Sequence, residues 1–104
     1  LGRGMVFNKF TGARGKSGSS DASAEYLGEL RRMMDENGVS YQLAELGRVD
    51  LGGGGTIAYI MARYGMDVID NGVAVMSMHA PWEVTSKVDI YEMKKGYDVF
   101  LRNA

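Results

Sequence analysis

The sequence predicts an α/β fold, with a layered sheet and flanking helices. The main observation is that segments with helical periodicity alternate with short apolar segments that favour strands. A second is that glycines and turn residues separate these segments. A third is a composition of 45% hydrophobic and 24% charged residues, which is typical of a globular domain. We expect the order strand, helix, strand, helix, strand, helix.

The chain starts with a short strand, expected over residues 5–10, and a loop over 11–20 that is rich in glycine, serine and basic residues. The loop contains Gly15-Lys16-Ser17, which resembles the end of a phosphate-binding P-loop. That motif needs a glycine five positions before Gly15, and Phe10 stands there. The spacing argues against a phosphate site, which stays a weak alternative.

Three helices are expected from residues with a spacing of three and four. The first spans about 22–37, with Ser20 or Asp21 as its cap. The second spans about 56–64, and the third begins near Ser86, in a sequence that resembles a capping box with Asp89 in place of the usual glutamate. The apolar faces are Tyr26, Leu27, Leu30, Met33 and Met34 in the first helix, Ile57, Ile60, Met61 and Tyr64 in the second, and Ile90, Met93, Tyr97 and Phe100 or Leu101 in the third.

Two further strands complete the pattern. Residues 39–46 precede a glycine-rich loop over 47–55, and residues 73–78 are a nearly continuous apolar run. Such a run is typical of a strand buried on both faces. Residues 70–72, Asp-Asn-Gly, predict the turn that comes before it.

Bulk properties exclude several classes of function. A formal net charge of −1 does not indicate a nucleic-acid partner or a polybasic membrane surface. The absence of cysteine excludes disulfides and thiolate zinc sites and fits a reducing compartment. No apolar run approaches the roughly 20 residues of a membrane-spanning helix, and no signal peptide is recognisable. We expect one segment over 1–104, with no nucleic-acid or membrane partner.

His79, the only histidine of the chain, follows the last apolar run. Ligands of open α/β sheets bind at the carboxyl ends of strands, and imidazole is the commonest metal ligand. The alternative is a buried structural histidine. Glu83 lies four residues later and could orient His79 as a supporting carboxylate, or it could serve only as a surface charge.

The glycine run Gly52–Gly55 and Thr56 form the second candidate site. Their backbone amides and the Thr56 hydroxyl could bind an anionic or carbonyl group, or the glycines could simply allow a crowded turn. A hydrolytic zinc site needs about three protein ligands, and a serine hydrolase of the Gly-x-Ser-x-Gly type needs an elbow that is absent. The residues therefore indicate one piece of an active site.

Several spaced motifs, taken together, resemble family M18 metalloaminopeptidases, which include aspartyl aminopeptidase and aminopeptidase I. The resemblance covers essentially the whole chain. The motifs are Gly2-Arg-Gly4, Lys9-Phe-Thr-Gly12, Gly15-Lys16, Ser20-Asp-Ala22, Ala24-Glu25, Gly52 to Ala58, Gly65 to Asp70, Gly72 and Met78 to Glu83.

The resemblance implies a C-terminal part of the catalytic domain of a zinc exopeptidase. In this family dinuclear zinc enzymes remove N-terminal residues from peptides, occur in the cytosol or vacuole, and form dodecamers. His79 would be a zinc ligand, and Gly54, Gly55, Thr56 and Lys9 would line the substrate pocket, with Asn8 as the alternative to Lys9. We therefore expect a cytoplasmic homo-oligomer with a peptide substrate.

The chain departs from the family pattern in two ways. Ala80 replaces the serine that usually follows the histidine, which leaves imidazole ligation possible. The other zinc ligands and the glutamate that acts as general base belong to upstream elements that this segment lacks. We therefore expect no catalytic residue in the segment and no activity from it alone. The alternative is a non-catalytic α/β module that keeps the fold for assembly, although such a module has no need of His79.

Overall fold

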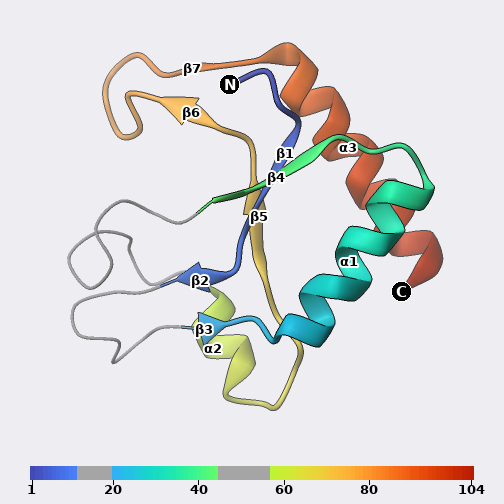
Figure 1. The fold of residues 1–104 in the computed structure, drawn as a ribbon. Helices are drawn as coiled ribbons and strands as arrows, with labels where there is room; N and C mark the ends of the chain where they lie inside the picture. Colours follow the sequence, from blue (N-terminus) through green and yellow to red (C-terminus); the bar gives the residue numbers. More distant parts are fainter. Residues whose placement is uncertain (12–19, 45–56) are drawn as a thin grey trace. The chain divides into compact units, whose positions relative to one another are not determined.

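The computed structural model describes residues 1–11, 20–44 and 57–104, which form helices and short strands (Figure 1). The α/β class is therefore as predicted. The helices are α1 (Ala24–Glu36), α2 (Ile57–Ala62) and α3 (Lys87–Asn103). The strands are β1 (Met5–Asn8), β2 (Phe10–Thr11), β3 (Ser20–Asp21), β4 (Tyr41–Ala44), β5 (Asp70–Gly72), β6 (Val75–Met76) and β7 (Val84–Thr85).

The described strands form three small sheets. Strands β4, β1 and β5 make a three-stranded sheet in that order. Strands β2 and β3 pair antiparallel, with Phe10 opposite Asp21. Strands β6 and β7 also pair antiparallel, with Val75 opposite Thr85. The β6–β7 hairpin positions the candidate site.

Two compact units divide the chain. The first consists of Leu1–Val6, Leu30–Gln42 and Asn71–Ala104, and the second contains the described residues of 7–29 and 43–70. We describe each unit by itself.

In the first unit the core gathers around the N-terminal residues and α3. Met5, Leu30 and Met34 are each at most 2% exposed. A methyl group at Gly96 of α3 would meet the side chains of Met5 and Met34. Glycine at this position therefore lets the helix backbone come close to both methionines, which a larger residue would hold off.

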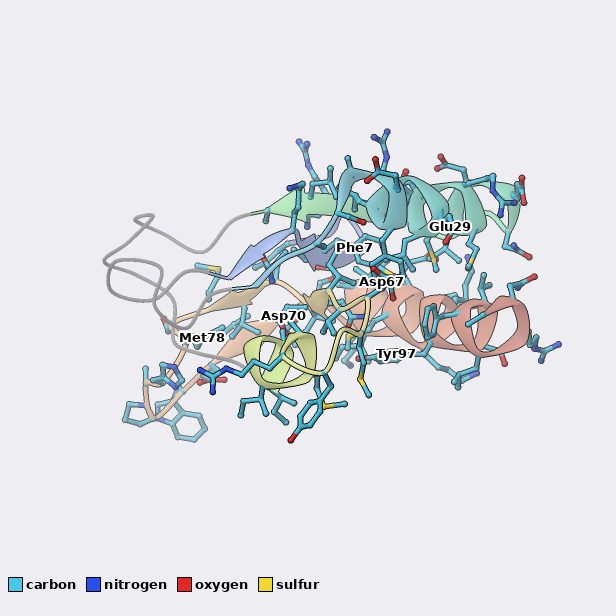
Figure 2. All side chains as sticks on the ribbon, turned by 90° about the horizontal axis from the view of Figure 1, so that it is seen from below. Phe7, Glu29, Asp67, Asp70, Met78 and Tyr97 are labelled. Atoms are coloured by element: carbon cyan, nitrogen blue, oxygen red, sulfur yellow. The ribbon has the colours of Figure 1, made fainter. Side chains whose placement is uncertain are left out.

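The second unit buries Phe7, Ala22, Leu27 and Ala58. Its part of α1 starts at Ala24, directly after Ser23, whose Oγ accepts the backbone N–H of Tyr26 at 3.1 Å. Partial burial raises the pKa of Tyr26, and the carboxylates of Asp67 and Glu29, both labelled in Figure 2, raise it further. The predicted caps Ser20 and Asp21 are wrong because both residues belong to β3.

The apolar face predicted for the first helix is confirmed, because Leu27, Leu30 and Met34 are buried. Gly38 follows the end of this helix with a φ of +63°, a conformation that costs glycine little.

The face predicted for the second helix is wrong. Among its described side chains α2 buries only Ala58, whereas Ile57 and Ile60 on the predicted face are exposed. Periodicity identifies an apolar face but does not say whether this chain covers it.

For the third helix, the predicted face is only partly correct, because Met93 and Phe100 are half-buried. Ile90, Tyr97 and Leu101 are exposed, and the buried residues of α3 are Asp89 and Gly96. The reason lies in two contacts distant in sequence: the Asp89 carboxylate bonds to the N-terminal segment, and Gly96 allows close approach of Met5.

The apolar run 73–78 is not a strand buried on both faces. Only Val75 and Met76 are in β6, and Met76 is 57% exposed. The run is cut short because Ser77 turns the chain with a φ of +58°. Residues 70–72 form β5 instead of the predicted turn. No helix within the described ranges is long and apolar enough to cross a membrane.

Candidate functional site

His79 lies in the loop that joins β6 to β7, one residue after Met78, which Figure 2 labels. At the base of the loop, Met76 pairs with Val84 and Val75 with Thr85. The Thr85 hydroxyl adds a hydrogen bond of 2.8 Å to the carbonyl oxygen of Ala74. A short, hydrogen-bonded stem thus carries the seven-residue stretch 77–83, which we call the His79 loop.

The backbone of the His79 loop is bent at two non-glycine residues. Ser77 and His79 have φ values of +58° and +68°. Side chains disfavour this left-handed region, and such residues persist where their surroundings hold them. A turn bond of 3.0 Å from the Ala80 amide to the Ser77 carbonyl helps to hold them.

Glu83 supplies the second restraint. Its Oε1 accepts the backbone N–H of His79 at 2.6 Å, across the loop. The structure therefore brings the two residues together, and the bond that joins them uses the main chain of His79. By holding the amide, the carboxylate fixes the backbone from which the imidazole projects.

The loop is exposed along its whole length, residues 77–83. His79, Glu83 and Trp82 are all exposed, and Trp82 is 87% exposed. Within this chain, the exposure of His79 does not fit the alternative of a buried structural histidine. An accessible imidazole on a restrained backbone is suited to bind a metal ion, so the residue fits the ligand role that the sequence predicts.

The loop offers one candidate ligand and not a complete centre. Within the described ranges no group of three or more histidine, cysteine, aspartate or glutamate side chains could hold a metal ion. A catalytic zinc ion needs about three protein ligands. Any metal held by His79 would therefore take its other ligands from elsewhere.

The predicted substrate-binding residues have separate outcomes. Gly54, Gly55 and Thr56 lie outside the described residues, so their role stays a prediction. Lys9 follows β1 and is partly buried, and its carbonyl oxygen accepts the Ala22 amide at 2.8 Å. Lys9 belongs to the second unit and His79 to the first.

Asp89 is a notable residue whose surroundings the sequence did not predict. It lies in the first turn of α3, is fully buried, and accepts the amides of Gly2 and Gly4, each at 2.8 Å. Burial acts to raise the pKa of this carboxyl, but the backbone N–H groups of Gly2 and Gly4, together with the positive N-terminus and the Arg3 backbone, outweigh burial and hold the pKa below its usual value. Two glycines with a single residue between them, Gly2 and Gly4, are the signal that could have suggested an anion-binding backbone here.

Comparison with known proteins identifies the family. A model described as aminopeptidase I zinc metalloprotease (M18) matches residues 1–101. A probable M18 family aminopeptidase 1 from Clostridium acetobutylicum is 65% identical over 103 residues, which are 99% of this chain and 22% of the relative. A protein of the same description from Thermotoga maritima is 50% identical over 97 residues, covering 93% of this chain and 22% of the relative.

Solved structures agree. The crystal structure of aminopeptidase I from Clostridium acetobutylicum matches with a TM-score of 0.90 and 65% identity, over 99% of this chain and 23% of that one. The M18 aminopeptidase from Thermotoga maritima matches with a TM-score of 0.89 and 48% identity, over 97% of this chain and 22% of that one. The chain thus spans less than a quarter of the length of these relatives. This chain belongs to the M18 aminopeptidase family.

Proposed function

We propose that the chain contributes the His79 loop to the active centre of a zinc-dependent aminopeptidase that removes N-terminal residues from peptides. The observation that carries the proposal is an exposed histidine on a loop restrained by Glu83, within a chain that matches M18 enzymes over nearly its whole length. The relatives' descriptions as aminopeptidases give no support to the alternative of a non-catalytic assembly module.

In the proposed centre, His79 would hold zinc through one ring nitrogen, and its other ring nitrogen would be free to donate to a carboxylate or carbonyl acceptor. Zinc, when bound, polarises the scissile carbonyl and lowers the pKa of water. Glu83 keeps the His79 backbone in the conformation that presents the imidazole. The description of the matching family as a zinc metalloprotease supports zinc as the metal. Two zinc ions per complete chain, with the remaining ligands and the general base from other segments, belong to the proposal.

The rest of the proposal rests on the family resemblance. The segment would be part of a layered catalytic domain of the zinc-exopeptidase type. Gly54, Gly55, Thr56 and Lys9 would line the pocket for the N-terminal end of the peptide. The enzyme would be a cytoplasmic homo-oligomer, with twelve subunits as in other family members.

The test compares the complete enzyme with its His79→Ala variant in zinc content and in hydrolysis of N-terminal residues from peptides. We expect the variant to lose zinc and most activity, because its loop keeps the backbone but loses the ligand. A Lys94→Ala variant, at an exposed position of α3, serves as the control and should retain both zinc and activity. Full zinc and full activity in His79→Ala would show that the histidine is not a ligand.

A further inference from the structure

The Asp89 carboxylate is buried in a small cradle of backbone amides at the N-terminal end of the chain. Its Oδ2 accepts from Gly2 and its Oδ1 from Gly4, each at 2.8 Å. Both glycines have positive φ, +78° and +92°, which turns neighbouring N–H groups toward one anion. We call this arrangement the Asp89 cradle. In Figure 1 the N-terminus lies close to the start of α3, in agreement with these bonds.

Helix capping does not account for the cradle. Ser86 is the N-cap residue of α3 and, within the described chain, makes no side-chain capping bond. Asp89 lies in the first turn but directs both oxygens to a segment more than eighty positions earlier in the sequence. A buried carboxylate is costly unless it is well hydrogen-bonded, and an apolar side chain in its place would leave the amides of Gly2 and Gly4 without this acceptor. The carboxylate therefore holds the start of α3 in one position relative to the Gly2–Gly4 segment.

Further contacts hold the next turns of α3 in the same unit. Glu92 Oε2 accepts the Ser40 amide at 2.7 Å, and Lys95 Nζ donates to the Gly38 carbonyl at 2.8 Å. Compared with these, the Asp89 cradle holds the turn nearest to β7. One residue, Ser86, separates the end of β7 from the start of α3. The cradle therefore fixes the point at which the chain leaves the hairpin.

We propose that Asp89 is a positioning residue for the metal ligand His79. By tying the start of α3 to Gly2 and Gly4, it sets the direction of β7, and through the β6–β7 pairing it sets the position of the His79 loop. Asp89 itself touches neither metal nor substrate in this proposal. The inference rests on the proposed role of His79 in zinc binding.

The test uses Asp89→Asn in the complete enzyme, because asparagine keeps the size but replaces one accepting oxygen with an NH₂ group that faces an N–H donor. We expect zinc affinity, measured by competition with a chelator, to fall about tenfold, at the lower end of what loss of a supporting partner costs a metal site. Hydrogen exchange of peptides from residues 77–86 should become faster in the metal-free protein. An unchanged zinc affinity would overturn the proposal.

Two controls separate positioning from general loosening. Asp98→Asn makes the same charge change on the same helix, at an exposed carboxylate paired with Arg102, and should leave zinc affinity unchanged. Leu30→Ala weakens the core of the same unit without touching the cradle. Equal loss of affinity in Leu30→Ala and Asp89→Asn would refute a specific role for Asp89.

A milder variant covers the case in which Asp89→Asn does not fold. At Gly2 a methyl group meets no described atom within 4 Å, so Gly2→Ala disturbs the cradle only through its positive φ. It should weaken zinc binding by a smaller factor, and an unchanged affinity would count against the proposal. The His79→Ala variant distinguishes failure of the proposed function from failure of the role proposed for Asp89. If His79→Ala retains zinc, the proposed function fails; if it loses zinc while both cradle variants bind normally, only the role of Asp89 fails.

Discussion

Gly96→Ala is a sharp test of how α3 packs in the first unit. The added Cβ would overlap Sδ of Met5 and lie 3.1 Å from its Cε and 3.5 Å from Sδ of Met34. Both methionines are only 1% exposed, so neither can move aside into solvent. Relief of the overlap requires a shift of the helix or a new methionine rotamer inside a filled core.

Two opposing terms set the magnitude. Replacing glycine with alanine inside a helix stabilises it by about 1 kcal/mol. Overpacking a filled core costs about 1–3 kcal/mol. Gly96→Ala should therefore lower the free energy of unfolding by up to about 2 kcal/mol. The matched control is Gly28→Ala in α1, where no described atom lies within 4 Å of the new methyl group, and it should stabilise by about 1 kcal/mol.

The assay is hydrogen exchange of peptides from β1 and α3 in the complete protein, which reports the local free energy of opening. In a Met5→Ala background the overlap is gone, and Gly96→Ala should become stabilising, although Met5→Ala itself costs about 2–5 kcal/mol. If Gly96→Ala slows exchange in the wild-type background as much as Gly28→Ala does in its own helix, contact with Met5 is not what requires glycine at position 96.

Three further predictions concern the same unit. Gly4→Ala should lower the thermal unfolding temperature, with a cost of at least about 2 kcal/mol, because its methyl group would overlap the Ser40 carbonyl at a φ of +92°. A normal unfolding temperature would refute the close approach. Glu83→Ala should speed exchange of the His79 amide, and Glu83→Gln should have a smaller effect because its oxygen can still accept; equal rates in all three proteins would contradict the bond. Acid should loosen α3, and Asp89→Asn should flatten the dependence of its hydrogen exchange on pH; an equally steep dependence in the variant would contradict this assignment.

The sign of the acid effect follows from two carboxyls. Backbone N–H groups overcome burial to lower the pKa of Asp89, and the Ser40 amide, followed by Lys95, lowers the pKa of Glu92. A carboxyl whose folded pKa is depressed contributes stability above its unfolded pKa, near 4, and loses that contribution as pH falls through the folded pKa. The loosening should thus start below about pH 4 and be absent between pH 5 and 7.

Hydrophobic periodicity predicted a buried helix face where the side chains of that face alone determine the packing. The apolar face of α1 was predictable because Leu27, Leu30 and Met34 recur at helical spacing and this chain covers them. The same reasoning was only partly right for α3, since Met93 and Phe100 are half-buried but Ile90 and Leu101 remain exposed. What determines that face is a small residue opposite Met5 and a carboxylate opposite two amides, and neither contributes to hydrophobic periodicity.

The candidate site divides in the same way. A lone histidine at the end of an apolar run was a local signal, and it led to the exposed His79 loop. The left-handed φ of His79 and its bond to Glu83 were not predictable from periodicity, because they depend on how one loop closes on itself.

Asp89 shows why a local rule can assign the right residue the wrong partner. Serine followed three residues later by an acidic residue predicts a capping box, in which the acidic side chain turns back to the start of its own helix. Here the Gly2–Gly4 backbone offers two amides to one carboxylate, and a buried carboxylate gains more from two such donors than from the single amide of a cap. The helix start is then held from outside, without a side-chain cap from Ser86 in the described chain. A restraint of this kind acts on the segment that leads into the helix. In this chain that segment is β7, which follows the His79 loop.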